Sequence, residues 1–127
     1  MSQTRDILPP ATVIDCYSII KLIGSGGFSL IYLAEDEDTQ DRVVIKEYLP
    51  RRIATRGERL RVEVLDDQND ETFNQGRKLF YQEAKALATL RHPNIVNVRT
   101  FFLAHNTAYL VMDYEPRKNL SHYIKSH

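Results

Sequence analysis

The chain has 127 residues, 43% of them hydrophobic, which is enough for one modest core but not for two independent domains. Its 17 basic residues balance its 17 acidic residues, so no overall field favours nucleic acid or an anionic membrane surface as a partner. Cys16 is the only cysteine, which excludes an internal disulfide and favours a reducing compartment. The sequence shows neither the apolar run of a signal peptide nor the roughly 18 apolar residues of a membrane span. We therefore expect a cytoplasmic protein without a membrane segment.

Residues 1–16 form a leader that contains Pro9-Pro10. Because proline disfavours helix and lacks a backbone donor, we expect an irregular or edge segment there. Three runs rich in β-branched and aromatic residues then predict strands at 17–23, 28–34 and 42–47. Short turns join these strands, so they should form an antiparallel meander.

The next segment, 50–69, is polar and offers one candidate short strand at 61–65. The pattern then changes to a helical period. One face of this helix carries Phe73, Phe80, Ala84 and Leu87. Asp70 or Thr72 could cap the start of the helix, which should run for about eighteen residues and end at Pro93.

Two further apolar runs, 95–103 and 107–112, are separated by a short connection that suits a hairpin. Residues 119–126 could begin a second helix. The expected fold is therefore α+β, with a five-stranded antiparallel sheet, one main helix and the start of a further helix at the carboxyl end.

A glycine-rich turn lies between the first two predicted strands, at Gly24, Gly26 and Gly27. Without Cβ atoms such a turn can adopt positive φ and lie close to a ligand, with backbone N–H groups directed at negative charge. A strand follows the glycines, which argues against the P-loop and dinucleotide folds, where a helix follows. The turn suits phosphate binding, although an ordinary tight hairpin could have the same glycines.

Lys46 ends the apolar run 43–46, and a lysine at a half-buried strand position is costly to desolvate unless it meets an anion. Phosphates or a carboxylate could supply that anion. Glu83 lies on the helical face beside Phe80 and Leu87, so it could pair with Lys46 between the sheet and the helix. Taken alone, Glu83 fits a solvated charge on the helix surface better than a partner of a buried lysine.

Five motifs, in this order, resemble the amino-terminal lobe of protein Ser/Thr kinases over residues 17–127. They are the glycine turn, Val43-Val44-Ile45-Lys46, Glu83, the string Arg91-His92-Pro93-Asn94-Ile95-Val96, and the run from Tyr109 to Glu115. The segment Glu47-Tyr48-Leu49-Pro50 is particularly similar to bacterial members of the family. The resemblance implies a leader at 1–16, the lobe at 17–112, and a hinge with the start of the second lobe at 113–127.

The resemblance also implies a site for ATP. Lys46 would hold the α- and β-phosphates, and Glu83 would orient Lys46 through an ion pair. Met112 would be the gatekeeper beside the adenine pocket, and backbone groups of Asp113 and Glu115 would bind the adenine edge. The remaining expected nucleotide contacts are Ile23, Gly24, Ser25, Gly26, Gly27, Phe28, Ser29, Ile31, Val44 and Tyr114.

Two residues depart from the family pattern: Ser29 stands at the third glycine, and Val44 replaces an alanine and would narrow the adenine pocket. The catalytic loop, the magnesium-binding motif and the helical lobe of the family do not appear before His127. We therefore expect no metal ligand in this chain, with Mg²⁺ and the protein substrate bound only when that lobe is present. The chain alone should be inactive, whereas the intact protein would transfer the γ-phosphate of ATP to protein hydroxyls.

A second hypothesis is a stand-alone lobe that acts as a binding or regulatory module. An isolated lobe would expose the apolar groups around Ile31, Leu87 and Met112, which invites association. A reading frame that continues past His127 into a catalytic loop would favour the enzyme fragment. An unrelated α+β domain with a coincidental glycine turn is a third alternative.

Overall fold

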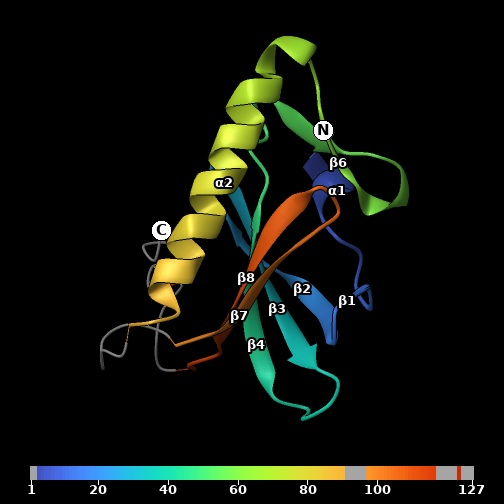
Figure 1. Ribbon diagram of the computed structural model, residues 1–127. Coiled ribbons are helices and arrows are strands. Elements are labelled where there is room, and N and C mark those ends of the chain that lie inside the picture. Colours follow the sequence, from blue (N-terminus) through green and yellow to red (C-terminus); the bar gives the residue numbers. More distant parts are fainter. Residues whose placement is uncertain (1–2, 91–96, 117–122, 124–127) are drawn as a thin grey trace.

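The computed structural model of the chain describes residues 3–90, 97–116 and 123, and shows a twisted sheet with one long helix against it (Figure 1). The elements are α1 (Gln3–Asp6), β1 (Val13–Ile14), β2 (Tyr17–Ser25), β3 (Ser29–Asp36), β4 (Arg42–Tyr48), β5 (Ala54–Arg56), η1 (Glu58–Leu60), β6 (Val62–Val64), η2 (Asp67–Asn69), α2 (Asp70–Leu87), β7 (Val98–Ala104) and β8 (Thr107–Asp113). The main sheet has the order β1-β2-β3-β4-β8-β7, and all its pairings are antiparallel.

The predicted meander, the hairpin and the main helix are present, but the sheet has six strands rather than five. The additional strand is β1, where the leader turns back and pairs Val13 with Ser18 and Ile14 with Tyr17. A sequence with only two residues in a strand shows no alternation long enough to predict it. A second helix was expected at 119–126; of that segment only Tyr123 lies among the described residues.

The segment between β4 and α2 contains a second, two-stranded sheet of β5 and β6. The short strand predicted at 61–65 is present as β6, and its partner β5 was not predicted. The amide of Val62 donates to the carbonyl of His105 at 2.8 Å, and the Asn106 side chain donates to the carbonyl of Val62 at 2.9 Å. These bonds attach the small sheet to the turn between β7 and β8.

The β7–β8 turn consists of two residues, His105 and Asn106, with φ of 52° and 61°. Positive φ at both central residues is the type I′ geometry that matches the right-handed twist of a hairpin. The sequence predicted a hairpin here from the spacing of the two apolar runs, and the structure confirms it.

Helix α2 packs against β7 and β8 through the face that the sequence predicts. Phe73 and Ala84 are buried on this face, and Phe80 and Leu87 are partly buried beside them. The helix therefore covers one face of the sheet.

None of the helices in the described part of the chain is long and apolar enough to cross a bilayer.

Both faces of the sheet are covered. Successive side chains of a strand point to opposite sides, so each strand contributes apolar side chains to both faces. The face toward α2 contains Ile31, Val44, Leu110 and Met112. The opposite face contains Tyr32, Ile45, Tyr109 and Val111, which pack with Leu8 and Ile14 of the leader and with Ala54 and Val62 of the small sheet. The leader and the 50–69 segment thus take the place of a second layer on the face away from α2.

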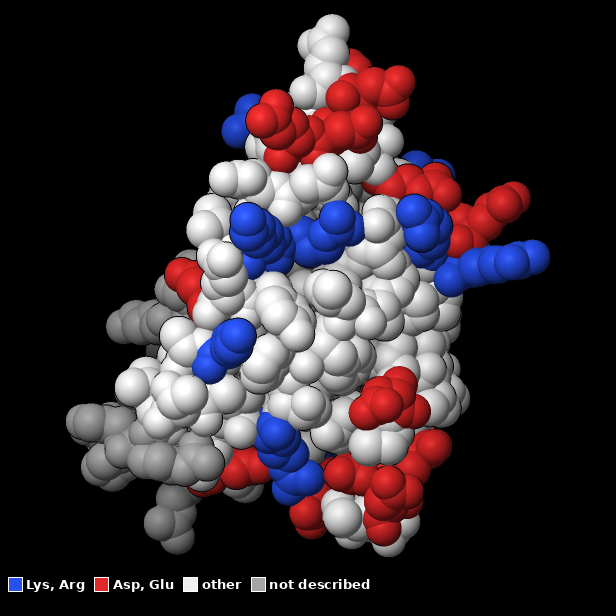
Figure 2. Space-filling model, viewed as in Figure 1, with Lys and Arg blue, Asp and Glu red and all other residues white. Residues whose placement is uncertain are grey.

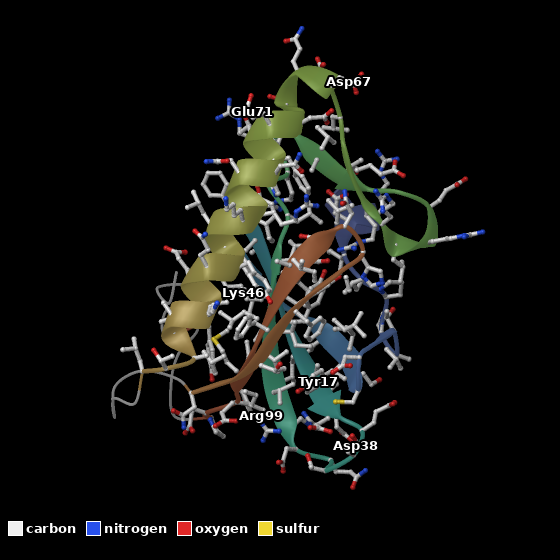
Figure 3. All side chains as sticks on the ribbon, viewed as in Figure 1. Tyr17, Asp38, Lys46, Asp67, Glu71 and Arg99 are labelled. Carbon is white, nitrogen blue, oxygen red and sulfur yellow. The ribbon has the colours of Figure 1, made fainter. Side chains whose placement is uncertain are left out.

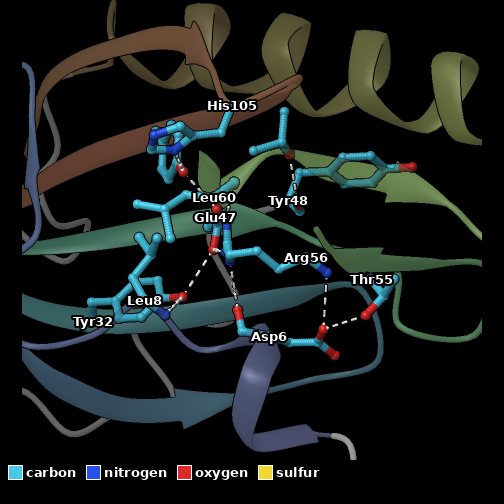
Figure 4. A network of polar contacts seen from close by, with 11 residues as sticks. Asp6, Leu8, Tyr32, Glu47, Tyr48, Thr55, Arg56, Leu60 and His105 are labelled. Carbon is cyan, nitrogen blue, oxygen red and sulfur yellow. Dashed lines mark hydrogen bonds and ion pairs between the residues drawn. The ribbon is translucent and has the colours of Figure 1, made fainter. Parts of the chain in front are cut away.

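A buried ion pair joins these covering segments to the sheet (Figure 4). Glu47 and Arg56 are 0% and 5% exposed, and Arg56 Nη2 lies 2.5 Å from Glu47 Oε1. The hydroxyls of Tyr32 and Tyr109 donate to the two carboxylate oxygens of Glu47 at 2.9 and 2.6 Å. Burial raises the pKa of both tyrosines, so they remain hydroxyl donors over the ordinary pH range.

Arg56 continues the network into the leader. Its Nε donates to the carbonyl of Asp6 at 2.9 Å, and its amide donates to the Asp6 carboxylate at 3.0 Å. Thr55 Oγ1 donates to the same carboxylate at 2.7 Å, and Arg56 Nη1 donates to the carbonyl of Leu60. Every buried side-chain nitrogen and oxygen in the described residues has a hydrogen-bond partner, so the network is fully satisfied.

Charges elsewhere are segregated locally although the net charge is zero. Figure 2 shows acidic side chains at the two ends of one face, with basic side chains in a band between them. At one end of the sheet Arg99 contacts the carboxylates of Asp36, Asp41 and Asp113. Because these groups are partly exposed, we expect these surface ion pairs to contribute little to the free energy of unfolding.

Candidate functional site

Lys46 lies in β4 on the face of the sheet that is turned toward α2 (Figure 3). It pairs with Ile31 of β3 and Leu110 of β8, so strands on both sides fix its backbone. Only 2% of the residue is exposed, and burial lowers the pKa of its ammonium to about 8, against the attraction of Glu83. The lysine is therefore a buried cation that an anion would stabilise.

Glu83 lies in α2 and is exposed. Lys46 and Glu83 line the same cavity, of about 490 Å³, between the glycine hairpin and α2. The salt bridges among the described residues are formed by Arg56 and Arg99 and do not include this pair. The carboxylate is thus on the same side of the sheet as Lys46 and raises the pKa of Lys46 from beyond contact distance.

The glycine-rich turn joins β2 to β3 and forms one wall of this cavity through Gly26, Gly27, Phe28 and Ser29. Gly26 donates to the carbonyl of Ser29 at 2.9 Å, which closes the turn. The turn does not use the positive φ that glycine allows, because none of the glycines, all of which lie among the described residues, has a positive φ. A Cβ at Gly26 or Gly27 would meet nothing within 4 Å, so the packing of the chain does not require glycine there.

The tip of this turn is held by residues that follow β4, which the sequence reasoning missed. The amide of Leu49 donates to the carbonyl of Phe28 at 2.8 Å, and Arg51 Nη2 donates to the carbonyl of Gly26 at 2.5 Å. Leu49 belongs to the Glu47-Tyr48-Leu49-Pro50 segment and Arg51 follows it directly. The resemblance of this segment to bacterial kinases was the signal in the sequence that could have pointed to these residues. Their contact with the glycine-rich turn depends on how the chain folds back.

The residues expected around adenine lie together on the α2 side of the sheet. Ile31, Val44 and Met112 are fully buried in one apolar cluster, and Ile23 is partly buried against it. Tyr123 completes this cluster. The structure therefore brings together side chains from β2, β3, β4 and β8 that the sequence assigned to one pocket, and Tyr123 fills space beside them.

The expected hinge backbone is engaged within the chain. The amide of Glu115 donates to the Tyr123 hydroxyl at 2.8 Å, and that hydroxyl also contacts the Glu115 carbonyl at 3.4 Å. The Asp113 side chain accepts from Arg99 Nε at 2.6 Å, and Tyr114 is 38% exposed. A base that used the Glu115 amide would have to replace the Tyr123 hydroxyl.

One cluster in the described part of the chain has the composition of a metal site, namely Cys16, Asp36 and Asp38, whose ligand atoms lie within 4.8 Å of one another. The Asp36 carboxylate already accepts from the amides of Asp38 and Thr39 at 2.9 and 3.3 Å. These bonds are those of an ordinary turn between β3 and β4. The cluster is remote from Lys46, since it lies at the end of β3 that pairs near Arg42.

Comparisons with known proteins give the same fold and a family. A model described as "Protein kinase domain" matches residues 17–127. The serine/threonine-protein kinase PknD of Chlamydia muridarum is 33% identical over 110 residues, and PrkC of Bacillus subtilis is 32% identical over 108 residues. These matches cover 87% and 85% of this chain but only 10% and 14% of those two proteins.

Solved structures include the apo form of PpkA-294, which matches with a TM-score of 0.83 and 32% identity. That match covers 86% of this chain and 39% of the other. The PknI kinase domain of Mycobacterium tuberculosis shares the fold, with a TM-score of 0.57 and 19% identity over 85% of this chain and 36% of that one.

The sheet, the packed helix α2 and the glycine hairpin define an α+β lobe of the kinase type. The chain belongs to the protein kinase domain family, and it corresponds to the amino-terminal lobe of a Ser/Thr kinase. It spans a small part of the length of the curated relatives named above.

Proposed function

We propose that this chain is the ATP-binding lobe of a protein Ser/Thr kinase. The observation that supports this most directly is the buried Lys46, which faces a cavity formed by the glycine turn on one side and by α2 with Glu83 on the other. A buried cation beside a loop with accessible backbone suits the phosphates of a nucleotide. The glycines at 26 and 27 have no internal packing reason, which is consistent with close approach of a ligand.

The residues present suit a nucleotide at two places, one for its phosphates and one for its base. The Lys46 ammonium would hold the α- and β-phosphates, Glu83 would orient that ammonium, and the backbone at 24–29 would cover the phosphates. The apolar cluster of Ile31, Val44 and Met112 would enclose the base once the Tyr123 ring moves aside. Mg²⁺, the group that orients the acceptor hydroxyl and the protein substrate would be held outside this chain.

An alternative is a binding or regulatory module without catalysis. The contact between Tyr123 and the backbone of Glu115 is the observation that favours it, because those groups would otherwise meet the base. The two functions differ in a simple measurement, since a module of this kind would neither bind nucleotide nor transfer phosphate.

The proposed function is tested with the full-length protein, MgATP labelled at the γ-phosphate, and a generic protein acceptor. Labelled phosphoserine or phosphothreonine should form, and the isolated 127-residue chain should give none. ATP at 100 times its dissociation constant should stabilise the full-length protein by about 2.7 kcal/mol in thermal unfolding. A full-length protein that shows neither transfer nor ATP-dependent stabilisation would contradict the proposal.

Nucleotide affinity of the full-length protein should fall as the pH rises through the pKa of Lys46, about 8. The ammonium is charged below that pH and neutral above it, so its charge-assisted bonds to phosphate, worth about 1.5–3 kcal/mol, are lost on the alkaline side. The dissociation constant of a fluorescent ATP analogue should therefore rise about tenfold or more across the transition.

The same titration tests the influence of Glu83. Because Glu83 raises the pKa of Lys46, the Glu83→Gln variant should lose affinity at a lower pH than the wild type. Glu71→Gln, an exposed change in the first turn of the same helix, is the matched control and should keep the wild-type midpoint. Identical midpoints for all three proteins would show that Glu83 does not act on Lys46.

A further inference from the structure

Tyr48, at the end of β4, packs against α2 between Phe73 and Phe80. It is on the same face of the strand as Lys46, two residues away, and it is 5% exposed. Its hydroxyl donates to the carbonyl of Phe73 at 3.0 Å, and its ring lies 5.3 and 5.8 Å from the rings of Phe73 and Phe80. The side chain therefore fixes the amino-terminal half of α2 against β4.

Gly76 is what allows this approach. A Cβ at this position would lie 2.1 Å from the Tyr48 hydroxyl oxygen, 2.9 Å from Cζ and 3.2 Å from Cε1. Glycine in a helix interior costs about 1 kcal/mol relative to alanine, and Gly76 does not have a positive φ that would require it. The close contact with Tyr48 is thus the structural reason for a glycine inside the amino-terminal half of α2.

The contact between Tyr48 and Gly76 is linked by geometry to the positions of Lys46 and Glu83. Lys46 and Tyr48 are two residues apart on one strand face, a separation of about 7 Å. Gly76 and Glu83 are seven residues apart on α2, about two helical turns or 10.5 Å, and thus on the same helix face. All four residues line one cavity, so the position of α2 at Gly76 determines where Glu83 lies relative to Lys46.

We propose that Tyr48 and Gly76 are positioning residues: their contact sets the place of α2 and thereby the distance at which Glu83 acts on Lys46. This inference rests on the proposed function, because the distance between Glu83 and Lys46 matters only if Lys46 binds nucleotide phosphates. Neither residue touches the reacting atoms, and their effect passes through Glu83.

The Gly76→Ala variant of the full-length protein tests the proposal. If the contact were unimportant, alanine would stabilise the helix. We expect instead that the new Cβ displaces α2, lowers the phosphotransfer rate by up to about 100-fold, and increases amide hydrogen exchange in 70–87. The pH midpoint of nucleotide affinity should also move downward, because Glu83 then lies farther from Lys46. A lower folded fraction alone would not move that midpoint.

A second substitution supplies the rescue. In Tyr48→Phe/Gly76→Ala the hydroxyl is absent and the nearest overlap becomes that of the ring carbon at 2.9 Å, so rate and midpoint should return part of the way to wild type. Tyr48→Phe alone should have a small effect because the ring remains. Gln75→Ala, exposed on the same helix, is the matched control and should resemble wild type.

The proposed function and the positioning role fail in different ways. A wild type that binds no nucleotide contradicts the proposed function and, with it, this inference. A wild type that binds nucleotide, together with a Gly76→Ala variant that keeps the wild-type rate and pH midpoint, overturns the positioning role alone. Failure of Tyr48→Phe to restore any of the loss in Gly76→Ala overturns it as well.

Discussion

Replacing Lys46 with methionine in the full-length protein should lower phosphotransfer by about 10²–10³-fold, the usual effect of removing one charge-stabilising group from an active site. Methionine fills a similar volume and has no charge, so the buried site loses the cation without gaining a cavity. Because a buried ammonium with a pKa of about 8 is itself costly, the variant should unfold at a temperature no lower than wild type. The measurements are the initial rate of phosphate transfer and thermal unfolding of the same preparation.

The matched control is Lys21→Met, which removes an exposed lysine from β2 of the same sheet. It should retain the wild-type rate. Full activity in Lys46→Met, or an equal loss in both variants, would show that Lys46 has no special role in binding phosphates.

Replacing Arg56 with leucine should destabilise the protein by about 3–5 kcal/mol, because the change leaves Glu47 charged and buried without its partner. Glu47 is 0% exposed, so water cannot reach its carboxylate to replace the guanidinium. The leader should also loosen, since the side chain of Arg56 donates to the carbonyl of Asp6. Urea unfolding measures the loss, and hydrogen exchange in residues 5–14 measures the loosening.

Two further variants separate the ion pair from general damage. Glu47→Gln/Arg56→Leu removes both charges and should cost less than Arg56→Leu alone, since no unpaired charge remains. Arg52→Leu removes an exposed arginine from the same segment and should stay within about 0.5 kcal/mol of wild type. If Arg56→Leu were as stable as Arg52→Leu, the network would have no part in holding the fold.

The two substitutions test two neighbouring residues of β4, Lys46 directly and Glu47 through its partner Arg56. Lys46 faces the cavity under the glycine turn, and Glu47 faces the opposite side, where it pairs with Arg56. The network therefore fixes β4 from the face of the sheet away from α2, at Glu47, the residue next to Lys46. The leader participates although the family match begins at residue 17, because Leu8 and Ile14 belong to the buried core.

The sequence by itself determined the elements whose signals are local. Runs of β-branched and aromatic residues predicted β2, β3, β4, β7 and β8, and the helical period predicted α2 from Asp70 onward, where the helix begins; its cap is Asn69 rather than Asp70 or Thr72. The helical period also placed Glu83 on the helix face beside Phe80 and Leu87. These features follow from backbone periodicity, which needs no knowledge of distant partners.

Only the tertiary structure decided which distant residues meet. The pairing of Glu47 with Arg56, the bonds from Asp6, and the contact of Tyr48 with Gly76 join segments whose separation in the chain carries no periodic signal. The pairing of β1 at the sheet edge and the hold of Arg51 on the glycine turn are of the same kind. From the local sequence, charged and small residues look like solvated or flexible positions. Their roles appear only in the folded chain, where burial removes water and these residues become partners of one another.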